Sequence, residues 1–233
     1  MPKDVLLVIT DISGYTKFMV SNKTSLHHAQ VIITELMQAI IKQINIPLQI
    51  SKLEGDAIFL YAIKDSEHAW KDARIDIARQ LPAFLDAFYE KLQQLKGVTN
   101  TCGCDACQHI EHLKLKVVVH SGHALFTHVG NFYELAGVDV IIVHRLLKNS
   151  IEGDEYILFT EAALQDIPFK HEKDLIRGTE NYGEIGTVNT FTYIPPTEHV
   201  VLPLSWFRKF VARVEHAVIS IKVFFKKTSF THF

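Results

Sequence analysis

Two aspartates lie where apolar, strand-like runs of the sequence end. Asp11 directly follows the aliphatic run VLLVI at 5–9, and Asp56 lies in the turn of the segment LQISKLEGDAIFLYAI. A carboxylate at the end of a buried strand is held rigidly while its oxygens face the rim of the sheet. Two such carboxylates can therefore converge on one divalent cation. The pair is a candidate metal site that handles phosphate groups.

The elements that must position these aspartates can be inferred from the flanking residues. Five consecutive aliphatic residues at 5–9, three of them β-branched, fit a strand in a sheet that is covered on both sides. Asp11 would end this strand, and the flexible pair Ser13-Gly14 would let the carbonyl of Ile12 point to the same place. Taken alone, an Asp after a strand also has an ordinary interpretation as an Asx turn.

The second aspartate belongs to a predicted hairpin. Leu48, Ile50 and Lys52 would lie on one face of its first strand, and the run AIFLY at 57–61 would form the return strand. Glu54-Gly55 supplies the turn, from which Asp56 would project. Gly-Asp is also common turn chemistry with no functional role.

A third segment, HSGHALFTHVGNFYELAGVDVIIVHRLLKNS at 120–150, adds an arginine to this pattern. It is typical of a strand end, a turn containing glycine, a short hairpin and then a helix. Asp139 is the expected N-cap of that helix, which would end near Asn149. Arg145 on the helix would face the same pocket as the aspartates.

In order, spacing and residue type these three segments resemble the class III adenylate and guanylate cyclase catalytic domain. The resemblance covers most of residues 1–194 and is to an uncharacterised bacterial branch with a Cys-rich insertion. DISGYT resembles the first metal-aspartate motif of that superfamily, KLEGD its motif with a substrate lysine and the second aspartate, and GVDVIIVHRLL its closing helix. The fold implied is α+β and ferredoxin-like, with helices packed on an antiparallel-rich sheet.

The resemblance implies two-metal chemistry on ATP. Asp11, Asp56 and the backbone carbonyl of Ile12 would hold two Mg²⁺ or Mn²⁺ ions. The ions would bind the triphosphate and activate the ribose 3′-hydroxyl for attack on the α-phosphorus, giving 3′,5′-cyclic AMP and pyrophosphate. The implied class of enzyme is an adenylate cyclase-type lyase.

The resemblance also implies residues that read the nucleotide. Lys52 matches the purine-reading position, where Lys favours ATP and Glu favours GTP, because an ammonium only donates and adenine N1 only accepts. Glu134 matches the second purine-reading position, and Arg145 the arginine that stabilises the phosphate in the transition state. The family forms head-to-tail homodimers, which would place the aspartates of one subunit opposite Lys52 and Arg145 of its partner.

One departure from the family pattern leaves two functions open. The family carries a ribose-orienting asparagine one helical turn before the arginine, where this chain has Ile141. His144 and Asn149 are nearby polar candidates to replace it. The first hypothesis is an active cyclase that uses ATP, or GTP. The second is a catalytically inactive homologue that acts as a nucleotide- or metal-binding signalling or dimerisation module.

Composition fits an ordinary folded protein. The 233 residues are 48% hydrophobic and 21% charged, enough for one large domain and a small appendage. A net charge of −2 gives no reason to expect nucleic-acid binding. No run reaches the roughly 18 uninterrupted apolar residues of a membrane span. Because the first residues show no signal-peptide pattern, the expected compartment is the cytoplasm.

The remaining pattern predicts the order of the elements. After the first strand we expect a helix over about 24–45, the hairpin and a long helix over 66–97, which Pro82 would kink or split. Beyond the helix that carries Arg145 we expect a strand at 155–160, a short helix and a strand at 187–194.

The insertion at 98–112 contains all three cysteines of the chain. Three thiolates and one imidazole would make a tetrahedral zinc site, and the alternative is a reduced surface loop. The candidate ligands are Cys102, Cys104, Cys107, His109 and His112.

After residue 194 the chain changes character. The segment 195–233 predicts a linker and an amphipathic helix, with an apolar seam from Leu204 to Phe225 and basic residues on its other faces. This helix would pack on the protein or a partner. The alternative is a peripheral contact with an anionic membrane surface, which Trp206 would favour.

Overall fold

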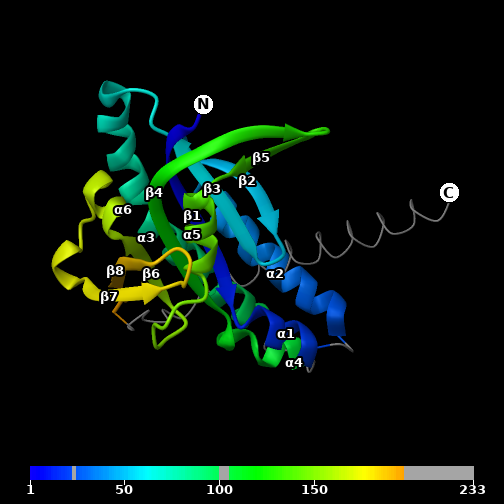
Figure 1. Ribbon diagram of the computed structural model, residues 1–233. Coiled ribbons are helices and arrows are strands. Elements are labelled where there is room, and N and C mark those ends of the chain that lie inside the picture. The colour runs from blue at the N-terminus through cyan, green and yellow to red at the C-terminus, as the bar shows by residue number, and fades with distance from the viewer. Residues whose placement is uncertain (23–24, 100–104, 197–233) are drawn as a thin grey trace.

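The computed structural model describes residues 1–22, 25–99 and 105–196 (Figure 1). The helices and strands, in chain order, are β1 (Lys3–Ser13), α1 (Tyr15–Ser21), α2 (Leu26–Ile41), β2 (Gln49–Glu54), β3 (Ala57–Ile63), α3 (Glu67–Thr99), α4 (Asp105–Gln108), η2 (Ile110–His112), β4 (Lys114–Val129), β5 (Phe132–Ala136), α5 (Val138–Arg145), β6 (Tyr156–Thr160), α6 (Glu161–Asp166), η3 (Glu172–Asp174), β7 (Ile176–Asn181) and β8 (Thr187–Tyr193).

The strands form one mixed sheet in the order β2-β3-β1-β4-β6-β8-β7, and β5 pairs with the far end of β4. Only the β4–β6 pair is parallel among the described strands. The hairpin of β4 and β5 projects beyond the body of the sheet (Figure 1). The predicted α+β architecture with an antiparallel-rich sheet is confirmed.

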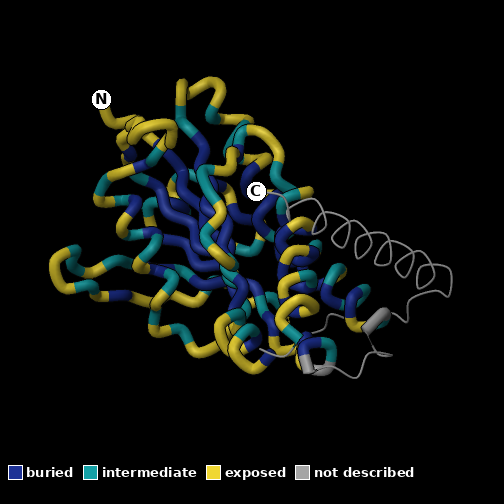
Figure 2. The backbone as a smooth tube through the Cα atoms, turned by 90° about the vertical axis from the view of Figure 1, so that its right-hand side faces the viewer, coloured by how far each residue is buried: buried dark blue, intermediate teal, exposed yellow. Residues whose placement is uncertain are grey.

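Alternation along the central strand divides the core into two layers. Leu6 and Val8 of β1 face one side of the sheet and pack with apolar residues of α1, α2, α3 and α6. Leu7 and Ile9 face the other side, which α5 covers. Because successive side chains of a strand point to opposite faces, a fully apolar strand requires both layers. Figure 2 shows these buried strands in dark blue in the middle of the molecule.

Most predicted elements are present, with a few differences. The long helix α3 runs unbroken from Glu67 to Thr99 with Pro82 inside it, so it is not split. Buried side chains on both sides of the proline, such as Leu81 and Phe84, hold the helix on the core through that turn. The edge strand β7 was not predicted, because its mostly exposed sequence IRGTEN lacks apolar alternation.

The segment around Ser121-Gly122 does not form the predicted turn. Instead β4 continues through it for 16 residues, pairing with β1 along its first part and with β5 along its last part. The prediction was wrong because glycine here allows close approach of another element. A Cβ on Gly122 would lie only 2.2 Å from Cγ of Asp139.

Asp139 is not the N-cap of α5. That position belongs to Gly137, at φ 144°, and the Asp139 carboxylate instead binds the neighbouring strand β4. Its Oδ1 lies 3.0 Å from Nε2 of the buried His120, and its Oδ2 accepts a 2.7 Å hydrogen bond from the backbone N–H of His123. The other ring nitrogen of His120 is 2.9 Å from the hydroxyl of Thr160. Asp139 therefore fastens the start of α5 to the sheet.

None of the described helices is both long and apolar enough to cross a membrane. The predicted C-terminal helix lies, from residue 197 on, outside the described residues. Its packing on a partner or on a membrane surface stays a prediction.

We expect Gly122→Ala to destabilise the protein by about 1–3 kcal/mol, because the added Cβ would overlap the Asp139 carboxylate. Urea unfolding measures this change. Gly178→Ala is the matched control on β7, where the added Cβ meets only the Thr190 hydroxyl, at 3.1 Å. In an Asp139→Ala background the cost of Gly122→Ala should fall, since the overlap is gone. An unchanged cost there would contradict this account of Gly122.

Candidate active site at the rim of the sheet

The structure brings Asp11 and Asp56 together. Asp11 lies near the end of β1, directly opposite Ala57 of β3, and Asp56 is the residue just before Ala57 in the β2–β3 turn. The backbone N–H of Ile12 donates a 3.3 Å hydrogen bond to the carbonyl of Asp56. Asp11 is inside the strand and does not end it, since β1 continues to Ser13. The close approach of the two acids follows from the β1–β3 register.

The two carboxylates oppose each other's ionisation. Burial and, to a smaller extent, the negative charge of Asp11 raise the pKa of Asp56 to about 6, against a backbone hydrogen bond that lowers it. Burial also raises the pKa of Asp11, and the ammonium of Lys116 partly offsets that rise. A half-buried acid pair with raised pKa values is a candidate site for a bound cation, because a cation would favour the ionised form of both acids.

Two neighbours of Asp11 were missed by sequence analysis. Lys116 of β4 pairs in register with Asp11, and its Nζ lies 3.4 Å from Oδ1 of Asp154 and 5.7 Å from the centroid of the Tyr156 ring. Burial raises the pKa of Tyr156 to about 12. A lysine in the apolar-looking run KLKVVV carries no motif that could have identified it, because only the β1–β4 register places it beside Asp11.

A second cluster joins the expected purine-reading residues. Nζ of Lys52 on β2 lies 3.2 Å from Oε2 of Glu134 on β5 and 3.2 Å from Oε1 of Glu54. Burial alone would lower the pKa of Lys52, but its hydrogen bonds to Glu54 and Glu134 outweigh burial and raise the pKa. Oε2 of Glu54 in turn lies 3.2 Å from Nε2 of His144 on α5. Sequence analysis did not anticipate the contacts of Glu54 and His144.

The exposed side of α5 presents Arg145 and Ile141. Arg145 is exposed, and its positive charge lowers the pKa of the nearby Tyr182, which burial raises to about 12. Ile141 is 52% exposed, on the same face one turn earlier. The helix therefore presents the exposed guanidinium of Arg145. At position 141 it carries an apolar side chain, where the family resemblance implies an amide.

The two polar residues near Ile141 are engaged elsewhere. Nδ2 of Asn149 donates to the Leu146 carbonyl at 2.7 Å and to the Tyr156 hydroxyl at 2.6 Å, and its Oδ1 accepts from the N–H of Ile151. The ring of His144 contacts the Val140 carbonyl at 2.7 Å on one side and Glu54 on the other. In this arrangement neither side chain replaces the amide that position 141 lacks.

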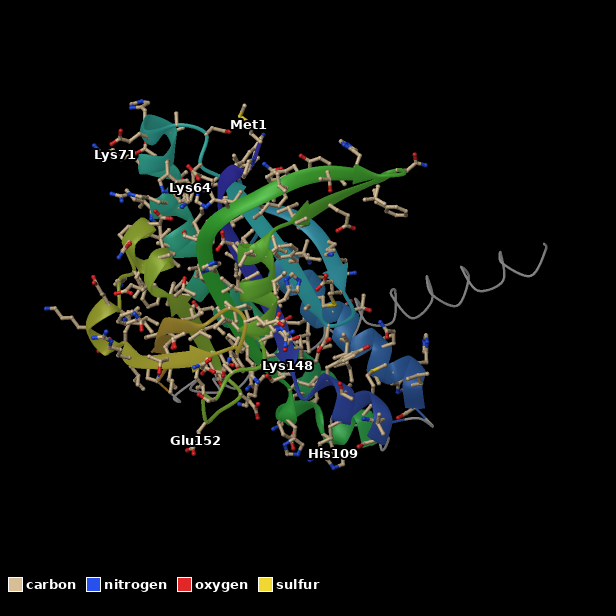
Figure 3. All side chains as sticks on the ribbon, in the orientation of Figure 1. Met1, Lys64, Lys71, His109, Lys148 and Glu152 are labelled. Atoms are coloured by element: carbon tan, nitrogen blue, oxygen red, sulfur yellow. The ribbon has the colours of Figure 1, made fainter. Side chains whose placement is uncertain are left out.

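The candidate zinc ligands are only partly within the described residues. Cys102 and Cys104 lie outside them, and the described part of the chain contains no group of three or more His, Cys, Asp or Glu side chains arranged to hold a metal. Cys107 packs against the main core, and the rings of His109 and His112 stack with centroids 5.9 Å apart. Figure 3 shows His109 beside α4, at the lower end of the molecule. Zinc binding by this loop stays a prediction.

The architecture is that of class III nucleotidyl cyclases. The adenylyl cyclase CyaB from P. aeruginosa aligns with a TM-score of 0.59 at 15% identity, covering 86% of this chain and 98% of that one. The guanylyl cyclase Cya2 aligns with a TM-score of 0.61 at 14% identity, covering 85% and 96%. A class III adenylyl cyclase-like ATP-binding protein from Pseudomonas aeruginosa aligns with a TM-score of 0.59 at 13% identity, covering 75% and 36%. These identities show the fold alone, and they confirm the predicted fold class.

Similarity at the sequence level leads to proteins without an assigned activity. An uncharacterised protein of Mycobacterium tuberculosis, Rv2561/Rv2562, is 31% identical over 143 residues, which cover 61% of this chain and 64% of that protein. This match therefore spans less than two thirds of its relative. The family described as protein of unknown function DUF2652 matches residues 33–156, and this chain belongs to that family.

Proposed function

We propose that the protein is a nucleotidyl cyclase that converts ATP to 3′,5′-cyclic AMP and pyrophosphate at a homodimer interface. The observation that carries the proposal is the meeting of Asp11 and Asp56 at the rim of the sheet, where burial and mutual repulsion raise the pKa of Asp56 to about 6. Such a pair is destabilised when it is ionised without a cation. The likeness of the fold to class III cyclases supports this reaction class by analogy.

The residues present fit a pair of divalent cations. Asp11, Asp56 and the backbone carbonyl of Ile12 supply oxygen atoms, the ligand type that Mg²⁺ and Mn²⁺ prefer, and Asp56 and Ile12 are already joined through the backbone. When bound, the ions would lower the pKa of the ribose 3′-hydroxyl and neutralise charge on the phosphates. In the reaction a bond forms between O3′ and the α-phosphorus, the bond from the α-phosphorus to the bridging oxygen breaks, and the hydroxyl proton is released as pyrophosphate departs.

Other residues would position the nucleotide. Lys52 and Glu134 form a donor and acceptor pair that matches adenine N1 and its amino group. The exposed guanidinium of Arg145 is suited to the charge that develops on the phosphate, because it stays protonated and presents forked donors. In a homodimer these groups of one subunit would act with the aspartates of the other.

Exposed apolar side chains on the projecting hairpin support the dimer. Leu125 and Val129 of β4 and Phe132 of β5 lie on the same face of the hairpin as Glu134, because side chains alternate along each strand and Val129 pairs with Phe132. An exposed apolar group beside the purine-reading cluster is a candidate interface.

The competing proposal is a nucleotide- or metal-binding module without turnover. Ile141 favours it, since loss of one positioned donor in such a site costs about 10²–10³ in rate. The engagement of Asn149 and His144 strengthens it, because neither replaces the lost donor. The likeness to an adenylyl cyclase-like ATP-binding protein is compatible with both proposals.

Metal binding and its pH dependence test the aspartate pair. A raised folded-state pKa means that ionisation of Asp56 opposes folding, so the wild type loses stability as pH rises from about 4 to about 6. Without metal, Asp56→Asn should therefore melt at a higher temperature than the wild type at pH 8, and the gap should close near pH 4. Mn²⁺ should raise the melting temperature of the wild type at pH 8, less at pH 5, and leave Asp56→Asn unchanged. If Mn²⁺ still raised the melting temperature of Asp56→Asn, Asp56 would not be a ligand of the metal.

Turnover tests the enzyme directly. Purified protein incubated with ATP and Mn²⁺ should release cyclic AMP, and Asp56→Ala should reduce the rate at least about 10²-fold, as expected when a metal ligand is lost. The control is Asp76→Asn, an exposed residue of α3 paired with Arg79, which should retain the wild-type rate. Nucleotide binding without any cyclic product would favour the module.

Restoring an amide on α5 is a sharper test of the missing donor. Ile141→Asn should raise the cyclase rate by up to about 10²-fold, because a donor then faces the ribose from the helix that carries Arg145. Ile75→Asn is the control, an exposed apolar position on α3 that should not respond. Equal rates in the wild type and Ile141→Asn would show that the ribose does not lie against this position.

A further inference from the structure

Lys116 lies beside Asp11 on the same face of the sheet. The two residues are directly opposite each other in the antiparallel β1–β4 pair. Side chains in such a position project to the same side, with their Cβ atoms about 4.5–5.5 Å apart. The positive charge of Lys116 reaches Asp11, because it lowers the pKa of that carboxyl against the larger effect of burial. The aspartate corner, formed by Asp11, Asp56 and the Ile12 carbonyl, therefore adjoins a cation that the protein itself supplies.

Contacts with two neighbours hold this ammonium in place. Lys116 pairs with Tyr156 in the parallel β4–β6 register, and its Nζ lies 5.7 Å from the centroid of the Tyr156 ring. That ring is 1% exposed, and its hydroxyl accepts a 2.6 Å hydrogen bond from Nδ2 of Asn149. On the other side, Nζ of Lys116 lies 3.4 Å from Oδ1 of Asp154. The ammonium is thus a placed charge of the site.

Asp154 offsets the charge of Lys116 only in part. The Asp154 side chain is 70% exposed, so water screens its carboxylate strongly, whereas only 19% of the Lys116 side chain is exposed. Asp154 also lies outside the strands, just before β6, while Lys116 is paired directly with Asp11. A net positive charge therefore remains next to the aspartate corner.

This charge acts in opposite directions on a bare metal ion and on a metal ion that carries an anion. One divalent ion balances the two aspartates, so the ammonium leaves the occupied corner positively charged. It repels the free ion, because like charges repel. It attracts the complex of that ion with a polyphosphate, because this complex is negatively charged overall. The effect acts through space and requires no hydrogen-bond donor of Lys116 to be free.

We infer that Lys116 makes the aspartate corner selective for a divalent ion bound to a polyphosphate over the free ion. Lys116 is thus a specificity-determining residue, separate from the purine-reading cluster of β2 and β5. The inference rests on the proposed function, which places metal ions at Asp11 and Asp56. Its consequence is that the metal enters the corner preferentially together with the polyphosphate.

Calorimetric titration of the full chain at pH 8 tests the inference with two probes, Mn²⁺ alone and Mn²⁺ premixed with inorganic tripolyphosphate. Lys116→Met should tighten the binding of Mn²⁺ alone by at least about threefold and weaken that of the complex by at least about tenfold. The methionine keeps an apolar stem against Tyr156 but carries no charge. Lys116→Arg, which keeps the charge, should return both dissociation constants to within about threefold of the wild type. A purely structural role would shift both probes in the same direction.

Lys114→Met is the matched control on the same strand. Lys114 has the same two kinds of contact as Lys116, since its Nζ lies 3.6 Å from Oε2 of Glu155 and 5.5 Å from the centroid of the Tyr89 ring. It pairs with Ser13 and not with Asp11. Each dissociation constant should therefore change by less than about twofold in this variant.

Asp154→Asn tests the same charge without changing the lysine. Because Asp154 is exposed, this variant should fold as the wild type does. Removing the acid leaves the ammonium less compensated, so Mn²⁺ alone should bind about twofold or more weaker and the complex about twofold or more tighter. This variant decides the question by itself if Lys116→Met does not fold.

The outcomes separate the role of Lys116 from the proposed function. Weaker binding of both probes in Lys116→Met, or no change in either, would overturn the role of Lys116 and leave the proposed function intact. Equal shifts of the two probes in Asp154→Asn would have the same meaning. If the wild type bound neither probe, the proposed function itself would fail, and the inference with it.

Discussion

Repulsion between Asp11 and Asp56 is the interaction on which the site depends. The β1–β3 register and the hydrogen bond from Ile12 to Asp56 force two acids into a half-buried corner where neither ionises easily. The backbone pairing of the central strands is much stronger than this local penalty, so the fold can hold the acids in that position. The unfavourable charge is therefore a property of the folded chain that a cation would relieve.

The position of helix α5 on the sheet is the second constraint on the site. A histidine and a carboxylate join it to the sheet near each end: Asp139 with His120 at its start, and His144 with Glu54 near its last turn. Burial lowers the pKa of His120 despite the neighbouring acid, so that contact is mainly a hydrogen bond between a neutral ring and a carboxylate at neutral pH. Apolar packing of Val140 and Val143 against the sheet completes the attachment. These contacts fix the orientation of α5 on the sheet, and with it the side of the helix from which the Arg145 side chain projects.

The parts of the site that sequence analysis could predict are those encoded by local pattern. Asp11 and Asp56 were found because each adjoins an apolar run, and these continuous apolar runs indicate the buried strands that bring the two residues together. Asp139 was assigned wrongly because an acid at the start of a helix is usually a cap, and only a contact with His120, 19 residues away, shows its real partner. The contact between Glu54 and His144 spans 90 residues, and no local signal marks it.

The length of β4 has a mechanical consequence. The first part of β4 pairs with β1 in the body of the sheet, and its last part pairs with β5 in the projecting hairpin. The hairpin is therefore a direct extension of a strand in the middle of the core. Glu134 lies on β5 in this hairpin, whereas Lys52 lies on β2 in the body of the sheet. Bending of the hairpin relative to the sheet would therefore change the distance between the Glu134 carboxylate and the Lys52 ammonium, while the β1–β3 pairing that holds Asp11 beside Asp56 stays in place.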